Sequence, residues 1–93
     1  EVGEFLYGLV RMIKPIYILE TGTHKGISAS YMGLAMKENG LSGRLDTIEY
    51  EEQHYRDSQD LFNKLEINHY VYGYKSVVNS FNPNNEYDIQ FLN

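Results

Sequence analysis

The chain has 93 residues, 42% of them hydrophobic, which is enough for one small domain with a single core. Thirteen acidic residues against eight lysines and arginines give a net charge of -5 without any basic cluster, so we expect no nucleic-acid partner. The sequence contains no cysteine, which excludes disulfides, thiolate metal sites and cysteine nucleophiles and fits a cytoplasmic protein. No apolar run is long enough to span a membrane, so we expect no membrane partner.

The first part of the chain is predicted to form helix, strand, turn and helix. Apolar residues at helical spacing over 4–14 predict an amphipathic helix, which Pro15 ends. The apolar segment 16–20 (IYILE) predicts a buried strand. The glycine-bearing segment 21–26 (TGTHKG) predicts a tight turn, and the spacing that follows it predicts a helix over 27–39, ended by an Asn-Gly pair.

The second part continues the alternation. Segment 44–50 (RLDTIEY) predicts a second strand, and 51–66 predicts a helix with acidic residues at its start. Segment 70–74 (YVYGY) predicts a third strand, 82–86 (NPNNE) a turn, and 87–92 (YDIQFL) a fourth strand. Helices alternating with short hydrophobic strands predict an α/β fold of three layers (α/β/α), in which helices cover both faces of a parallel sheet.

The turn after the first strand is the most informative stretch for function. Gly22 and Gly26 would let a ligand approach free backbone N–H groups, and in open α/β sheets ligands bind at the carboxyl ends of the strands. The dinucleotide-binding fingerprint (G-x-G-x-x-G) requires a second glycine at position 24, where this chain has His24. The P-loop motif requires a lysine directly after its last glycine, but here Lys25 comes before Gly26. Both motifs are therefore absent. Glycines here could also serve the turn alone.

The pattern formed by Glu20, Gly22, Gly26 and Ser28 (E-x-G-x-x-x-G-x-S) follows the strand IYIL. It resembles the first motif of the class I S-adenosylmethionine (SAM)-dependent methyltransferases, and most of all the small O-methyltransferases that include catechol O-methyltransferase. Glu49 ends the second strand, where that family holds an acidic residue against the ribose hydroxyls of the cofactor. A carboxylate can accept two hydrogen bonds from a vicinal diol, which gives this role a physical basis.

The resemblance continues along nearly the whole chain. Residues 71–73 (VYG) resemble the family's third strand, which leads to the adenine contact, and 87–93 resemble its fourth strand. The resemblance implies a Rossmann-like fold with strand order 3-2-1-4, truncated after the fourth strand, so that 1–93 is a single partial SAM-binding domain. We expect an excerpt of a longer protein, because the sequence lacks an initiator methionine and ends abruptly.

The implied function is SAM-dependent methyl transfer to an oxygen of a small-molecule or sugar-like acceptor. The resemblance implies that Glu20 accepts the cofactor's ammonium group. His24 would contact the cofactor's carboxylate or have no role in the site. Tyr74 stands where the family commonly has a small or acidic residue, and its ring could stack on the adenine. The full set of implied cofactor-binding residues is Glu20, Gly22, Thr23, His24, Gly26, Ser28, Glu49, Gly73, Tyr74 and Asn93. No residue is identified as catalytic. Asn93 stands where the metal-dependent branch has an aspartate, so we expect no metal.

Two other functions remain open from the sequence. One is a nicotinamide-dependent Rossmann oxidoreductase, against which the incomplete glycine fingerprint counts. The other is a non-catalytic binding or interaction fragment, which the short length and Asn93 favour. Because the resemblance implies a truncation after the fourth strand, we expect 87–92 to be an exposed edge through which the chain could form homo-oligomers.

Two groups of side chains are assigned to packing or to the surface. His54 and His69 are not in a metal-binding pattern, and we interpret them as surface or packing residues. Tyr70, Tyr72 and Tyr74 alternate along the third predicted strand, and we expect their rings to pack under a helix.

Overall fold

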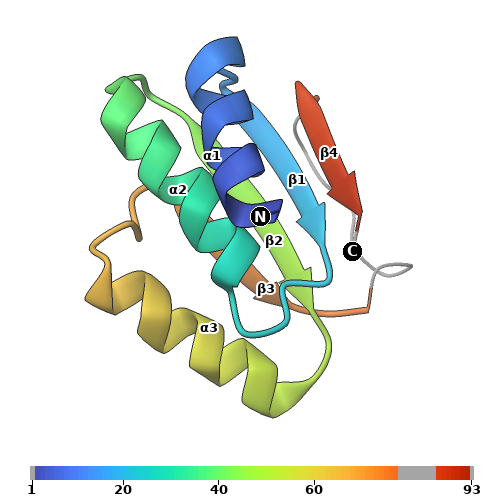
Figure 1. Ribbon diagram of the computed structural model, residues 1–93. Coiled ribbons are helices and arrows are strands. Elements are labelled where there is room, and N and C mark those ends of the chain that lie inside the picture. Colours follow the sequence, from blue (N-terminus) through green and yellow to red (C-terminus); the bar gives the residue numbers. More distant parts are fainter. Residues whose placement is uncertain (1, 78–85, 93) are drawn as a thin grey trace.

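The computed structural model describes residues 2–77 and 86–92, which form three helices and four strands (Figure 1). Their order along the chain is α1 (Val2–Ile13), β1 (Tyr17–Thr21), α2 (Ile27–Asn39), β2 (Arg44–Glu49), α3 (Glu52–Lys64), β3 (Val71–Lys75) and β4 (Ile89–Leu92). Every predicted helix and strand is present, and no end differs from the expected one by more than two residues.

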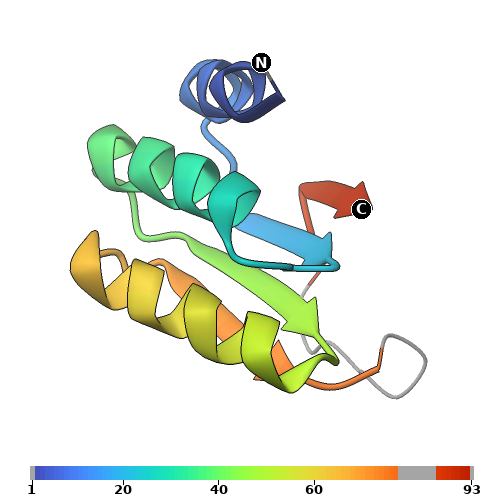
Figure 2. The same ribbon diagram turned by 60° about the horizontal axis from the view of Figure 1, so that its bottom comes forward.

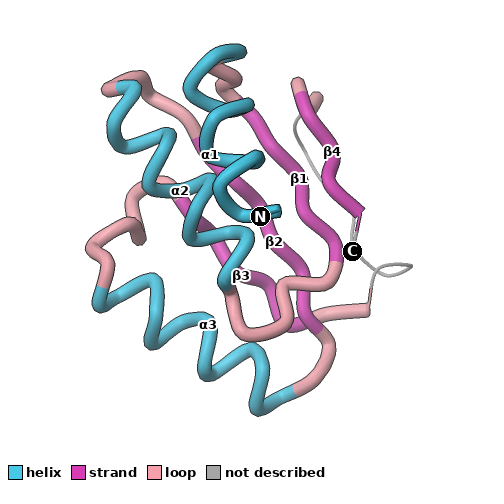
Figure 3. The backbone as a smooth tube through the Cα atoms, viewed as in Figure 1, coloured by secondary structure: helices cyan, strands magenta, loops and turns pink. Residues whose placement is uncertain are grey.

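The four strands form one parallel sheet with the order β3-β2-β1-β4 (Figure 3). In the register of this sheet Ile18 is the partner of both Leu45 and Ile89, and Leu45 is the partner of Val71. The predicted α/β class and the strand order 3-2-1-4 are therefore confirmed.

All three helices lie over the same face of the sheet, as Figure 2 shows. The chain moves in one direction from β1 to β2 to β3, and right-handed crossovers in one direction place their helices on one face. Only the return from β3 to β4 runs the other way, and 78–85 lie outside the described residues. The described part of the chain thus has two layers, and the second helical layer of the expected three is not within it.

The core lies between the sheet and these helices. Phe62 of α3 is 2% exposed, and Met32 of α2 and Ile18 of β1 are exposed by 1% and 0%. The buried cluster consists of Leu6, Val10, Ile18, Ala29, Met32, Ala35, Met36, Leu45, Phe62, Ile67 and Val71. None of the helices in the described residues is long and apolar enough to cross a membrane.

The tyrosines of β3 do not all lie where the sequence predicted. Gly73 faces α3, because a Cβ at this position would be 2.1 Å from Nε2 of Gln59. Since successive side chains of a strand point to opposite faces, Tyr72 and Tyr74 lie on the face away from the helices. No helix among the described residues covers these two rings, so their packing under a helix stays a prediction, whereas Tyr70 does pack against the core.

The face away from the helices carries a polar cluster around a buried carboxylate. Asp46 is only 2% exposed, and its Oδ1 accepts a hydrogen bond of 2.9 Å from Nε of Arg44. The guanidinium of Arg44 lies 3.9 Å above the centre of the Tyr72 ring, and its Nη2 donates to the hydroxyl of Tyr74 over 2.7 Å. The hydrogen bond with Asp46, as the main cause, raises the pKa of Arg44.

Candidate functional site

The loop between β1 and α2 folds over the end of β2. The backbone N–H groups of Gly22 and Thr23 both donate to the carbonyl oxygen of Ile48, over 2.9 and 3.0 Å. Gly22 has φ of 80° and Gly26 has φ of 94°, a region that glycine enters without steric cost. These two bonds hold the loop at the carboxyl edge of the sheet.

Gly26 is required for a second reason, because the loop here touches α3. A Cβ at Gly26 would lie 3.0 Å from the Cβ of Ser58 and 3.1 Å from Cε1 of Phe62. A side chain would therefore force the start of α2 away from α3. The predicted glycine is confirmed as a residue that shapes the loop.

Glu20 anchors the loop from below. The side chain is 0% exposed, its Oε2 accepts a hydrogen bond from the hydroxyl of Ser28, and its Oε1 accepts one of 2.6 Å from the hydroxyl of Thr47. Because the Thr47 proton is used on Glu20, Thr23 is the donor in the 2.5 Å contact between the two threonine hydroxyls. These residues join β1, β2, the loop and the first turn of α2 through one network, in which the bonds of Thr47 are buried.

Glu49 occupies the position that the sequence predicted, at the end of β2. The residue is 3% exposed, and its two oxygens accept backbone N–H bonds from different segments. Oε1 accepts from His24 over 2.7 Å, and Oε2 accepts from Glu51 over 3.0 Å. The carboxylate thus joins the loop after β1 to the start of α3.

A cavity of about 290 Å³ opens beside this carboxylate. Its lining residues come from the ends of β1 and β2, from the start of α3 and from the residue that follows β3, and they are Thr21, Gly22, His24, Ile48, Glu49, Tyr50, Glu51, His54 and Ser76. Because it lies at the carboxyl edge of a parallel sheet, this is the place where open α/β folds bind ligands.

A second cavity of about 440 Å³ shares part of this lining. It lies between the start of α1, the loop and the start of α2, and it is lined by Val2, Gly3, Thr23, His24, Lys25, Ile27, Ser28 and His54. His24 and His54 line both cavities. The two histidines therefore stand between the two cavities.

The structure brings most of the predicted site residues together. Gly22, His24 and Glu49 line the first cavity, and Thr23 and Ser28 line the second. Glu20 lies beneath the loop, so a contact with a ligand's ammonium group would require it to leave its two hydroxyl partners. The predicted contact by Asn93 lies outside the described residues.

Gly73 and Tyr74 are not brought to the cavity. Gly73 pairs with Thr47, two residues before Glu49, so it lies below the edge of the sheet. Tyr74 points to the opposite face, where it contacts Arg44. The residue that reaches the cavity from this strand is Ser76, whose N–H donates to the carbonyl oxygen of Glu49 over 3.0 Å.

Sequence reasoning missed His54 as well. It lies in the first turn of α3, its N–H donates to the carboxylate of Glu51, and its Nδ1 is 3.9 Å from Oε2 of Glu49. The helix after β2 must begin at the same sheet edge as the loop after β1, so a histidine in its first turn could have been placed near the site.

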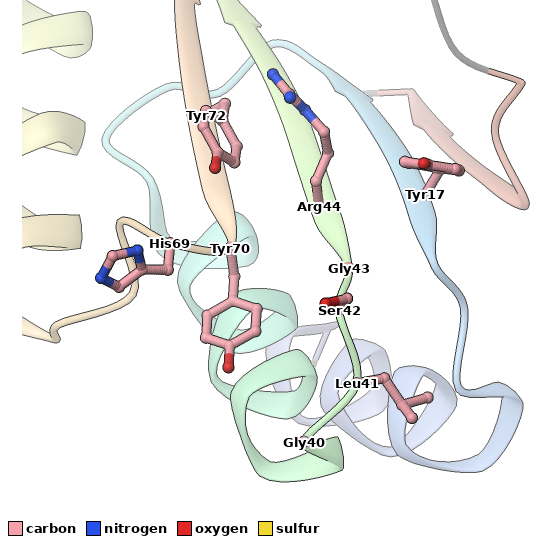
Figure 4. Close-up of a pocket in the computed structure, with 9 residues that line it drawn as sticks. All are labelled: Tyr17, Gly40, Leu41, Ser42, Gly43, Arg44, His69, Tyr70 and Tyr72. Atoms are coloured by element: carbon pink, nitrogen blue, oxygen red, sulfur yellow. The ribbon is translucent and has the colours of Figure 1, made fainter.

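A cavity at the opposite edge of the sheet is a different environment. It measures about 460 Å³ and is lined by Tyr17, Gly40, Leu41, Ser42, Gly43, Arg44, His69, Tyr70 and Tyr72 (Figure 4). Arg44 and Tyr72 lie side by side there, and Arg44 is already paired with Asp46. This cavity lies at the amino ends of the strands, so the carboxyl-edge cavity is the better ligand site.

Comparisons with known proteins place this arrangement among solved structures. The chain matches TomG from Streptomyces achromogenes, an O-methyltransferase involved in tomaymycin synthesis that was solved with SAM. The TM-score is 0.82 and the identity is 24%, and the match covers 97% of this chain and 42% of TomG. It also matches an O-methyltransferase from Bacillus cereus, solved with S-adenosylhomocysteine (SAH). Here the TM-score is 0.83 and the identity is 25%, over 98% of this chain and 43% of that one.

A third match is to a methyltransferase from another organism. The SAH-bound methyltransferase PaMTH1 of Podospora anserina gives a TM-score of 0.85 and 22% identity, over 97% of this chain and 38% of that one. The chain thus spans about two fifths of the length of these structures. No protein-family profile and no curated protein matches it.

Proposed function

We propose that this chain, which has the fold of the class I SAM-dependent O-methyltransferases, forms the cofactor-binding part of such an enzyme. The observation that carries the proposal is the position of Glu49. Its buried carboxylate ends β2, lines the carboxyl-edge cavity and holds the glycine loop in place. The matched structures with SAM or SAH support the choice of ligand.

The carboxylate of Glu49 has capacity for a ribose. Each of its oxygens accepts one backbone N–H bond, and a carboxylate oxygen can accept a second bond. The two vicinal hydroxyls of the cofactor's ribose would supply those two further donors. Its two backbone bonds keep Glu49 in this orientation before the ligand arrives.

The start of α2 would receive the cofactor's carboxylate. The helix begins after Gly26 without a hydrogen bond from a side-chain cap, so the positive end of the helix dipole is open to an anion. His24 and Lys25 line the cavity at this end of the helix. From the third strand, Ser76 replaces Gly73 and Tyr74 as the residue proposed to approach the adenine.

The bound cofactor would supply an activated methyl group for transfer to an oxygen of a small-molecule or sugar-like acceptor. The residues described here would bind and orient that cofactor, which contributes to catalysis by positioning. We assign none of them to proton transfer. We also keep the expectation, drawn from the composition, that the protein is cytoplasmic. The proposal includes no nucleic-acid or membrane partner.

Calorimetric titration of the full-length protein with SAM, SAH and NAD tests the proposal. We expect SAM and SAH to bind and NAD to bind more weakly or not at all, because the loop lacks the glycine spacing of the dinucleotide fingerprint. Tighter binding of NAD than of either adenosyl ligand would favour the oxidoreductase and contradict the proposal. Binding of none of the three would favour the non-catalytic fragment.

A further inference from the structure

Glu49 carries a buried negative charge next to two histidines. It is 3% exposed, and within residues 2–77 and 86–92 no lysine or arginine pairs with it. The nearby cations Arg56 and Lys75 are instead paired with Glu52, over 2.7 and 2.9 Å. Burial of a carboxylate without a cation is costly, so a positive ligand at this position would be stabilised.

The two histidines provide the ligands that such a cation would need. His24, Glu49 and His54 each offer one ligand atom, and these atoms all lie within 4.8 Å of one another. The Nδ1 of His54 is 3.9 Å from Oε2 of Glu49. Two imidazoles and one carboxylate are a ligand set that suits Zn²⁺ and similar transition metals better than Mg²⁺.

The movement required to complete the site is small. Nitrogen and oxygen ligands at about 2.0 to 2.2 Å from a tetrahedral metal lie about 3.3 to 3.6 Å apart. His24 is exposed and His54 is partly exposed, and their rings are tilted by 58° with centres 6.0 Å apart, so they do not stack. Glu49, held by two backbone bonds, would be the fixed ligand.

We propose that His24, Glu49 and His54 form a binding site for a transition-metal ion such as Zn²⁺, and that an ion bound there competes with the cofactor. All three residues line the carboxyl-edge cavity, which could admit a water molecule as the fourth ligand. The carboxylate of Glu51, 3.7 Å from Nδ1 of His54, adds negative charge beside the site. The competition rests on the proposed function, because Glu49 is also the proposed ribose ligand.

Metal binding is tested first without any cofactor. The full-length protein, free of any histidine tag, is titrated with Zn²⁺ by calorimetry and with Co²⁺ by visible absorption, with Mg²⁺ for comparison. We expect one Zn²⁺ per chain, a Co²⁺ spectrum typical of low coordination number, and no comparable binding of Mg²⁺.

Substitutions locate the ion. Changes that only affect the surroundings of a metal ligand cost about 10- to 100-fold in affinity, so His24→Ala and His54→Ala should each weaken Zn²⁺ binding by about 100-fold or more. His69→Ala is the matched control, because this exposed histidine lies at the opposite edge of the sheet. Zn²⁺ binding that is absent, or equally strong in all three variants, would overturn the proposal.

Competition is measured separately, as the ratio of SAH affinities with and without saturating Zn²⁺. We expect Zn²⁺ to weaken SAH binding in the unmodified protein and the ratio to return to about one in His54→Ala. An unchanged ratio in the unmodified protein would overturn the competition. A protein that binds Zn²⁺ through these histidines and never binds SAH would contradict the proposed function and leave the metal site standing.

Discussion

The hydroxyl of Tyr87 donates a hydrogen bond of 2.6 Å to Oδ2 of Asp46, and this contact joins segments 41 residues apart in the chain. Asp46 lies in β2, one of the two inner strands, on the face of the sheet without described helices, whereas Tyr87 lies just before β4. The bond therefore ties the last described segment to the centre of the sheet, together with the pairing of β4 and β1.

Loss of this bond should destabilise the fold. We expect Tyr87→Phe to lower the free energy of unfolding by about 1 to 2 kcal/mol. The bond is to a charged group, which makes the loss larger, whereas the partial exposure of Tyr87 makes it smaller. Urea unfolding at neutral pH measures the change. Tyr50→Phe is the control, since Tyr50 is 72% exposed, and it should change stability by less than about 0.5 kcal/mol.

The same contact should make stability fall at alkaline pH. Burial first, and the hydrogen bond to Asp46 second, raise the pKa of Tyr87 above its ordinary value of 10.0. The folded protein then keeps the hydroxyl proton that the unfolded chain loses, so this contribution is complete below pH 10.0 and decreases as the pH rises beyond it. Tyr87→Phe should remove that part of the decrease, and an identical pH profile in both proteins would contradict the assignment.

The role of Glu49 can be separated from the general negative charge around it. We expect Glu49→Ala to weaken binding of SAH by about 1.5 to 3 kcal/mol, the range for hydrogen bonds to a charged group. Glu52→Ala should change the affinity little, because the Glu52 carboxylate is turned to Lys75 and Arg56, which lower its pKa. Calorimetric titration compares the two variants. Equal losses would mean that the acidic cluster acts only through its field.

Activity of the full-length protein is expected to be independent of a divalent metal. Asn93 stands where the metal-dependent O-methyltransferases have an aspartate, and an amide is a weaker ligand for Mg²⁺ than a carboxylate. Initial rates in excess chelator should equal those without it, or exceed them if Zn²⁺ occupies the site formed by the two histidines. A rate abolished by chelator and restored by Mg²⁺ would show that the prediction is wrong.

The edge formed by β4 should promote self-association of the 93-residue chain. In the described residues β4 pairs only with β1, with Asp88 also accepting N–H bonds from Ile16 and Tyr17, and Leu92 is 70% exposed. An unprotected strand edge offers free N–H and C=O groups to another chain. Light scattering over a concentration series should show an average molar mass that increases with the concentration of the 93-residue chain. A longer form that includes downstream residues should show no such increase. A monomeric, cooperatively melting short chain would contradict this.

The elements themselves could be predicted from the sequence because they depend on local patterns. Pro15 ends α1, Gly26 and Gly40 bound α2, and the apolar segments between the helices are the strands. The placement of Gly22 and Glu49 at the same sheet edge follows, because strands in a parallel sheet all end there. Predicting the position of these residues did not require knowledge of the tertiary contacts.

Side-chain direction and distant neighbours were decided only by the tertiary structure. A strand's side chains alternate, so the contact of Gly73 with α3 sends Tyr72 and Tyr74 to the far face. No local pattern specifies which face a strand with alternating tyrosines presents. The sequence could place His54 at the same sheet edge as Glu49, but the direct contact between the two side chains depends on how α3 leaves β2. The sequence alone determined which residues lie at the sheet edge that carries the candidate site. The packing of the helices against the sheet decided which of their side chains point into the cavity.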